Sequence, residues 1–98
     1  MGSLRRYIVT YDIADPARLR HVEKIMTNHG SRVQLSVFFC DLSPQSLNRM
    51  KRLLLQNILD TEDSVMIVNI GGEDASQSSP FTYLGQARPK QPISYRIV

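Results

Sequence analysis

Apolar and polar positions alternate in patterns that divide the first third of the chain into a strand and a helix. Residues 6–13 are rich in β-branched and aromatic side chains, which favours a central strand. Asp15 and Pro16 then fit the N-cap and the first position of a helix. Gly30 is expected to end that helix as a left-handed cap. Its apolar residues fall on one face at helical spacing: Leu19, Val22, Ile25 and Met26.

The next run, residues 31–42, alternates with a period of two. One set of positions is Val33, Leu35, Val37 and Phe39, and the other is Arg32, Gln34, Ser36 and Phe38. This period predicts one apolar face, carried by the first set, and one largely polar face. The pattern leaves open whether residues 31–42 form one long strand or two short strands joined by a bulge or kink near Ser36.

The second half of the chain repeats the helix signal and then returns to strands. Ser43 and Pro44 begin a helix that ends near Ile58, with a core stripe of Leu47, Met50, Leu54 and Ile58. Residues 64–70 form a nearly continuous apolar strand, which suggests burial on both faces. A polar loop is expected at residues 73–80, followed by a short strand at 81–84, an extended linker at 86–92 and a last strand at 93–98.

This order, strand-helix-strand-strand-helix-strand with one strand added, predicts the fold class. We expect an α+β, ferredoxin-like βαββαβ domain: one antiparallel sheet with two helices on one face and an extra C-terminal strand. The whole chain, 1–98, forms the domain, with residues 6–70 as its core and 73–92 as loop and linker. The other sheet face would then be bare, and a second copy of the chain would be able to cover it.

Composition changes this picture only modestly. A net charge of +3 and an isoelectric point near 9.4 permit nucleic-acid binding without requiring it. The single cysteine, Cys40, cannot form an intrachain disulfide, which favours a reducing compartment. No apolar run approaches the roughly 20 residues needed to span a membrane, so a cytoplasmic protein is expected.

Candidate chemistry centres on Asp12, where the first strand turns toward the helix. No P-loop, G-x-G-x-x-G pattern or zinc-ligand spacing is present in the sequence. On pattern alone, Asp12 fits a turn residue better than a catalytic one. A single carboxylate makes a poor Mg²⁺ site, but a two-fold dimer would supply a second one. Basic and aromatic residues would bind phosphates or stack on bases, although solvated charge and core packing are the simpler alternatives.

Several segments taken together resemble one known family. They are residues 7–15, Arg18, residues 30–38 and residues 63–65, and the resemblance spans most of residues 6–70. The family is that of the small CRISPR-associated adaptation nucleases, the non-integrase partner in spacer acquisition. The resemblance implies a ferredoxin-like homodimer in which the C-terminal strand packs on the partner's sheet. It also implies Mg²⁺-dependent cleavage of RNA or double-stranded DNA, with an adaptation integrase as partner.

Carried over residue by residue, the resemblance assigns roles to seven side chains. Asp12 of each chain would hold Mg²⁺, with Asp12 and Tyr11 as catalytic residues. Contacts to nucleic acid would come from Arg18, Arg20, Arg32, Ser36 and Phe38. Phe39 departs from the family pattern, in which an acidic residue often follows the phenylalanine. Two alternatives remain: a non-catalytic dimer that bridges DNA, and a toxin-type ribonuclease of similar fold.

Overall fold

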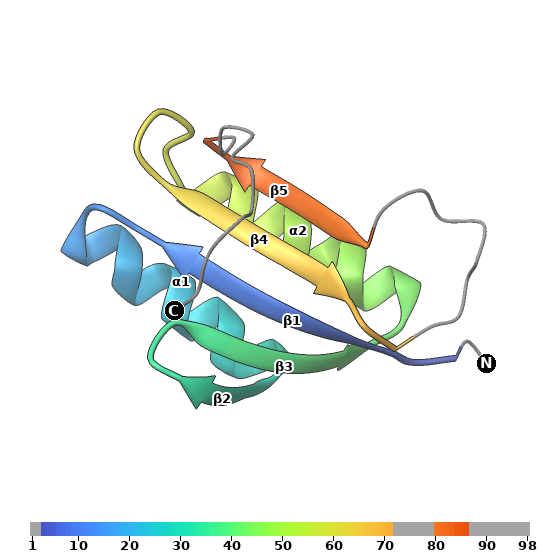
Figure 1. Cartoon of the computed structure of the whole chain (residues 1–98). Helices are drawn as coiled ribbons and strands as arrows, with labels where there is room; N and C mark the ends of the chain where they lie inside the picture. Colours follow the sequence, from blue (N-terminus) through green and yellow to red (C-terminus); the bar gives the residue numbers. More distant parts are fainter. Residues whose placement is uncertain (1–2, 72–79, 87–98) are drawn as a thin grey trace, which may run out of the picture.

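Two helices pack on one face of a five-stranded sheet (Figure 1). The structure is a computed structural model, and it describes residues 3–71 and 80–86. In chain order the elements are β1 (Arg5–Asp12), α1 (Pro16–His29), β2 (Ser31–Gln34), β3 (Val37–Leu42), α2 (Pro44–Asn57), β4 (Ser64–Asn69) and β5 (Phe81–Gly85). The strands lie in the order β2-β3-β1-β4-β5, and every neighbouring pair is antiparallel. The ferredoxin-like prediction is therefore confirmed.

Both helices begin where the cap-and-proline signals predict. The Asp15 carboxylate accepts hydrogen bonds from the backbone N–H groups of Ala17 and Arg18 at the start of α1 (2.9 and 3.0 Å). The Ser43 hydroxyl accepts one from the Ser46 N–H at the start of α2 (3.1 Å). These bonds satisfy N–H groups that a helix leaves unpaired in its first turn. The predicted core stripes are also confirmed, since they contain the fully buried residues Val22, Met26, Met50 and Leu54.

Gly30 ends α1 for a reason other than the predicted one. Its backbone is extended, with φ at −168°, so the prediction of a left-handed cap was wrong. A Cβ on this residue would lie 2.4 Å from the backbone oxygen of Phe39 and 2.5 Å from the Cys40 sulfur. The glycine therefore permits the end of α1 to lie directly against β3.

The run at residues 31–42 forms two strands, which resolves the alternative that the sequence left open. A turn at Leu35 and Ser36 separates β2 from β3, and the pairing shifts register between Arg32 and Gln34. The predicted single apolar face was wrong, because the turn interrupts the alternation: Val37 and Phe39 share one side of β3, but the opposite side, expected to be largely polar, is the buried one. The core side of β3 carries Phe38, Cys40 and Leu42, whereas Val33, Leu35 and Phe39 are 49%, 77% and 37% exposed.

Strand β1 separates the molecule into two faces. Tyr7, Val9 and Tyr11 are buried beneath the helices. The alternate positions, which include Ile8, Thr10 and Asp12, lie on the opposite side of the sheet, here called the open face. Strand register adds side chains from three other strands to this face: Val37, Phe39, Met66, Val68, Phe81 and Tyr83.

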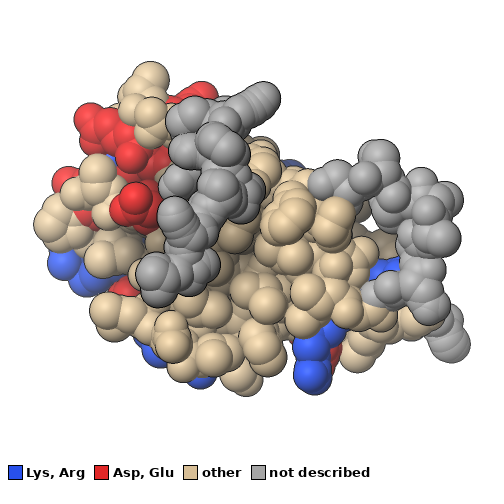
Figure 2. Space-filling view, viewed as in Figure 1, with Lys and Arg blue, Asp and Glu red and all other residues tan. Residues whose placement is uncertain are grey.

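The open face is largely apolar. Figure 2 shows it as mostly uncharged, with acidic side chains gathered at the end of the sheet where β1 stops and β4 begins. Phe81 and Tyr83 are 47% and 48% exposed, and their rings stack with centroids 6.5 Å apart. The expected burial of β4 on both faces is not found in the single chain, because Met66 and Val68 are only half-buried.

Several predicted segments lie outside the described residues: most of the polar loop (73–79), the linker from residue 87 onward and the C-terminal strand at 93–98. The short strand predicted at 81–84 is confirmed as β5. Among the described residues, neither helix has the length and apolar character needed to cross a membrane.

Candidate functional site

Asp12 is the last residue of β1, and its side chain is exposed on the open face. It pairs across the sheet with Ser64, the first residue of β4. Its carboxylate makes no hydrogen bond or ion pair with any other residue in the described ranges, 3–71 and 80–86. Within these ranges, the fold makes no structural use of this carboxylate.

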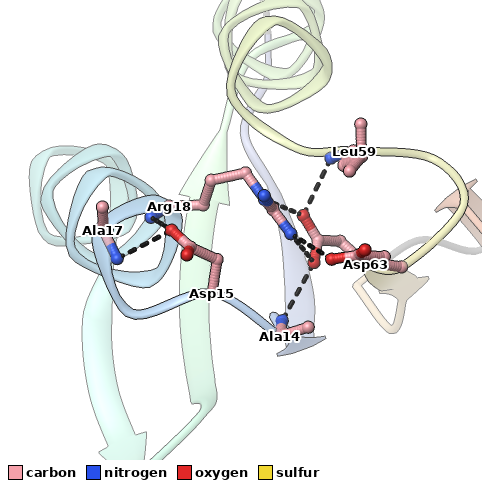
Figure 3. Close-up of polar contacts among 7 residues, drawn as sticks. Ala14, Asp15, Ala17, Arg18, Leu59 and Asp63 are labelled. Carbon is pink, nitrogen blue, oxygen red and sulfur yellow. Dashed lines mark hydrogen bonds and ion pairs between the residues drawn. The ribbon is translucent and has the colours of Figure 1, made fainter.

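The turn that follows Asp12 is held by two other carboxylates (Figure 3). Asp15 caps α1, as described above. The backbone N–H of Ala14 donates to Oδ1 of Asp63, which comes from the loop before β4 (2.9 Å). Asp12 is thus not needed as the turn former that its sequence pattern suggested, and this weakens the simpler interpretation of the residue.

Asp63 is fully buried and accepts four hydrogen bonds. Two come from the Arg18 guanidinium, through Nε (2.7 Å) and Nη2 (3.2 Å). The other two come from the backbone N–H groups of Ala14 (2.9 Å) and Leu59 (2.8 Å). The hydrogen bonds from Arg18 are the main reason that the pKa of Asp63 is lowered to about 2. Burial opposes this shift, but Arg18 and the two backbone donors together outweigh its effect.

Sequence reasoning missed this role of Asp63. The residue stands in a polar run that was expected to be a plain turn, and its partner Arg18 lies 45 residues away in the chain. Only the resemblance to a family, which included residues 63–65, pointed to the position.

Arg18 was predicted to contact nucleic acid, and the structure directs it toward the protein instead. Its guanidinium contacts Asp63 and also donates to Glu62 (2.9 Å), which leaves the side chain 25% exposed. These carboxylates raise the pKa of Arg18 above its ordinary value. Arg20 is exposed, and no ion pair joins it to another described residue. Phosphate binding by Arg18 or Arg20 stays a prediction, with Arg20 the more accessible of the two.

Tyr11 and Phe38 lie on the helix side of the sheet, away from Asp12. They are 6% and 0% exposed, with ring centroids 6.1 Å apart, so both are core residues in this arrangement. Burial raises the pKa of Tyr11, and its buried hydroxyl has no hydrogen-bond partner among the described residues. A catalytic role for Tyr11 and base stacking by Phe38 stay predictions.

Arg32 and Ser36 shape the β2–β3 turn beside these rings. The Arg32 guanidinium lies 5.1 Å from the centre of the Phe38 ring and donates to the backbone oxygen of Leu35 (2.6 Å). The backbone oxygen of Ser36 accepts from the Tyr11 N–H (3.2 Å). The structure therefore does not bring the predicted site residues together: Asp12 lies on the open face, the aromatic-arginine group lies on the other side, and Arg18 and Arg20 lie on α1.

A single chain does not build a complete metal site within the described residues. No group of three or more His, Cys, Asp or Glu side chains is close enough together there to hold an ion. Any metal bound at Asp12 would therefore take further ligands from water, from substrate or from a second chain.

These features define a class of protein: a small ferredoxin-like domain with a strand-end carboxylate, unpaired among residues 3–71 and 80–86, beside a largely apolar sheet face that no described helix or strand covers. The family model described as CRISPR associated protein Cas2 matches residues 5–78. The chain belongs to this family, as the sequence resemblance implied.

Individual relatives support the same assignment. The "CRISPR-associated endoribonuclease Cas2 1" of Rhodospirillum rubrum is 44% identical over 66 residues, which cover 66% of this chain and 64% of that protein, so the match spans less than two thirds of the relative. The "CRISPR-associated endoribonuclease Cas2 3" of Synechocystis is 32% identical over 71 residues, covering 72% and 77%. The crystal structure of Streptococcus pyogenes Cas2 at pH 6.5 has a TM-score of 0.63 and 39% identity, covering 67% and 86%.

Proposed function

We propose that this chain is a Mg²⁺-dependent endonuclease of CRISPR spacer acquisition, which hydrolyses phosphodiester bonds in RNA or double-stranded DNA. The observation that carries the proposal is the Asp12 carboxylate, exposed at the end of β1 and without a structural partner among the described residues. A carboxylate that the described part of the fold does not use can serve as a ligand of Mg²⁺. The names of the Rhodospirillum and Synechocystis relatives, both endoribonucleases, support a nuclease of this kind.

The working form in this proposal is a homodimer built on the open face. Phe39, Phe81 and Tyr83 are between 37% and 48% exposed there, and burying such aromatic surface favours association. In a two-fold dimer the same face meets itself. Because Asp12 lies on this face, the partner's Asp12 would lie on the surface that covers it. The C-terminal strand predicted at 93–98 would add to the interface.

Two Asp12 carboxylates fit the ligands that Mg²⁺ prefers. The ion is usually bound by one or two carboxylates, with water and phosphate oxygens completing its shell. When bound, Mg²⁺ supplies a Lewis acid that polarises a phosphoryl oxygen and lowers the pKa of a water molecule. The protein's own contribution would be to hold the two carboxylates at fixed strand ends and to orient the nucleic acid.

Basic side chains would orient that nucleic acid. Arg20 is exposed on α1, and the net charge of +3 per chain doubles in a dimer. A positive surface attracts RNA and DNA without regard to sequence, and salt weakens the attraction. In spacer acquisition the dimer would act together with an adaptation integrase.

Asp12→Asn tests the proposal because it keeps the shape of the side chain and removes its charge. We expect loss of Mg²⁺-dependent cleavage of single-stranded RNA and of duplex DNA, with thermal stability, association and duplex affinity close to those of the parent. Asp60→Asn is the matched control, since it removes an exposed carboxylate from a nearby turn. A folded Asp12→Asn protein that cuts at the parent rate would overturn the proposal and favour the non-catalytic, DNA-bridging dimer.

A further inference from the structure

The Asp63 carboxylate and backbone connect three segments that are far apart in the chain. Its side chain binds the β1–α1 turn through the Ala14 N–H and the Arg18 guanidinium. It also binds its own loop through the Leu59 N–H. Its backbone oxygen accepts from the N–H of Gln86, just after β5 (2.8 Å). Asp63 therefore fixes the end of the sheet at which β1 stops.

This network surrounds Asp12 on both sides. Along the chain, Ala14 is two residues beyond Asp12 and donates to the Asp63 side chain. Across the sheet, Asp12 pairs with Ser64, which directly follows Asp63. The pairing of β1 with β3 ends at Thr10 and Val37, so Asp12 has a ladder neighbour on one side only. Beyond the last β1–β3 pair, the hydrogen bond from Ala14 to Asp63 secures the chain at the end of β1.

The Asp12 side chain makes no hydrogen bond or ion pair with another residue in the ranges 3–71 and 80–86, so the backbone of the strand end decides where its carboxylate can lie, within the rotamers open to the side chain. A strand end held on one side frays unless other bonds secure it. The Asp63–Arg18 ion pair is a suitable anchor, because a planar guanidinium bound through two nitrogens fixes direction as well as distance. Glu62 accepts a further hydrogen bond from Nη2 of the same guanidinium, the nitrogen that also donates to Asp63.

We propose that Asp63 and Arg18 are positioning residues, which hold the end of β1 so that the Asp12 carboxylate is presented at a fixed place on the open face. The inference rests on the proposed function, because it concerns the same carboxylate. It assigns Arg18 a task different from phosphate binding: the guanidinium acts through Asp63 and Ala14 and does not touch the substrate.

Two variants test this assignment, each measured at a temperature well below its melting point. Arg18→Lys keeps the positive charge but cannot form two fixed bonds to Asp63. Asp63→Asn keeps the shape but removes the ion pair. Lys24→Gln is the matched control, since it removes a charge from an exposed position on the same helix. Circular dichroism establishes that each protein is folded, and if Asp63→Asn does not fold, Arg18→Lys alone decides.

The first readout is metal binding without substrate. Mn²⁺, used in place of Mg²⁺, is titrated into each protein, and the free ion is measured by electron paramagnetic resonance. Loss of a residue that orients a metal ligand typically weakens affinity by roughly 10–100-fold, so we expect a loss of about tenfold in both variants. Lys24→Gln should bind Mn²⁺ as the parent does.

The second readout separates kcat from KM in cleavage. We expect kcat to fall roughly 10–100-fold, the effect of a small misplacement of a reacting group, with KM and duplex affinity nearly unchanged. If Arg18→Lys and Asp63→Asn bind Mn²⁺ and cut as the parent does, while Asp12→Asn loses both activities, the positioning role is overturned and the proposed function stands. If Asp12→Asn itself keeps both activities, the proposed function fails first. An Arg18 effect confined to duplex affinity would also overturn the positioning role, in favour of phosphate contact.

Discussion

Replacing Asp63 by Asn should lower the stability of the fold more than a typical polar substitution. The carboxylate accepts four hydrogen bonds of 2.7–3.2 Å in a site with no solvent exposure. An amide offers one oxygen and presents an NH₂ group to donors, so at least one backbone N–H or the guanidinium loses its acceptor. Breaking a buried ion pair costs about 3–5 kcal/mol. We expect about 3 kcal/mol, because water reaches the arginine partner, and a melting temperature lower by roughly 10–20 °C.

The stability lost in Asp63→Asn should depend on pH in a defined direction. The pKa of Asp63 falls from its ordinary value of 3.8 to about 2 in the folded protein. Because the folded-state pKa is the lower one, ionised Asp63 stabilises the fold, by about 2 kcal/mol at neutral pH. This contribution is complete above about pH 4 and disappears as the pH falls through 2. The difference in stability between parent and Asp63→Asn should therefore stay constant from neutral pH to about pH 4 and narrow from there to about pH 2.

Urea denaturation followed by circular dichroism measures this difference at several pH values and one protein concentration. Asp41→Asn is the matched control, because it breaks the two-bond ion pair with Arg6 at the other end of β1, where both side chains are about half exposed. That change should matter little, since water already solvates both groups. A parent–Asn difference at Asp63 that stays constant down to pH 2.5, or one no larger than at Asp41, would refute the reasoning.

Two further predictions test the assignment of faces and the binding surface. Phe38→Ala should lower the free energy of unfolding, measured in urea, by about 3–5 kcal/mol, because the ring is fully buried. Phe39→Ala, on the open face, should leave the fold stable and weaken association in sedimentation. Equal losses of stability in the two variants would contradict this assignment of faces. Arg20→Glu should weaken duplex binding, with a loss that shrinks as salt rises from roughly 50 to 200 mM. A loss independent of salt in a filter-binding assay would argue against phosphate contact.

Local signals in the sequence were sufficient to predict the helices, the central strand and the fold plan. Asp15, Pro16, Ser43 and Pro44 determine helix starts through contacts with residues three positions away or fewer, which a reader of the sequence can see. The faces of residues 31–42 were not predictable in the same way. Alternation indicates faces only while a strand continues, and the turn at Leu35 and Ser36 interrupts it.

The candidate site was predictable in one part and not in another. The place of Asp12 at a strand end could be predicted because it is a local feature, but the pattern alone favoured a turn residue and only the family resemblance implied a metal ligand. The buried role of Asp63 could not be predicted, because its partner Arg18 is brought to it by folding from another part of the chain. For the same reason Gly30 was explained wrongly: the atoms that exclude a side chain there belong to β3, and no pattern within the helix reveals them.

The two faces of β1 restrict how this strand can evolve. Substitution changes one side chain at a time, and the neighbours of that side chain can adapt to it. Loss or gain of a single residue between Tyr7 and Asp12 would instead exchange the faces of everything beyond it, sending the Asp12 carboxylate under the helices and a core ring into water. Single substitutions in β1 can therefore be accommodated more easily than insertions or deletions. The number of residues in the strand decides on which face the carboxylate at its end lies.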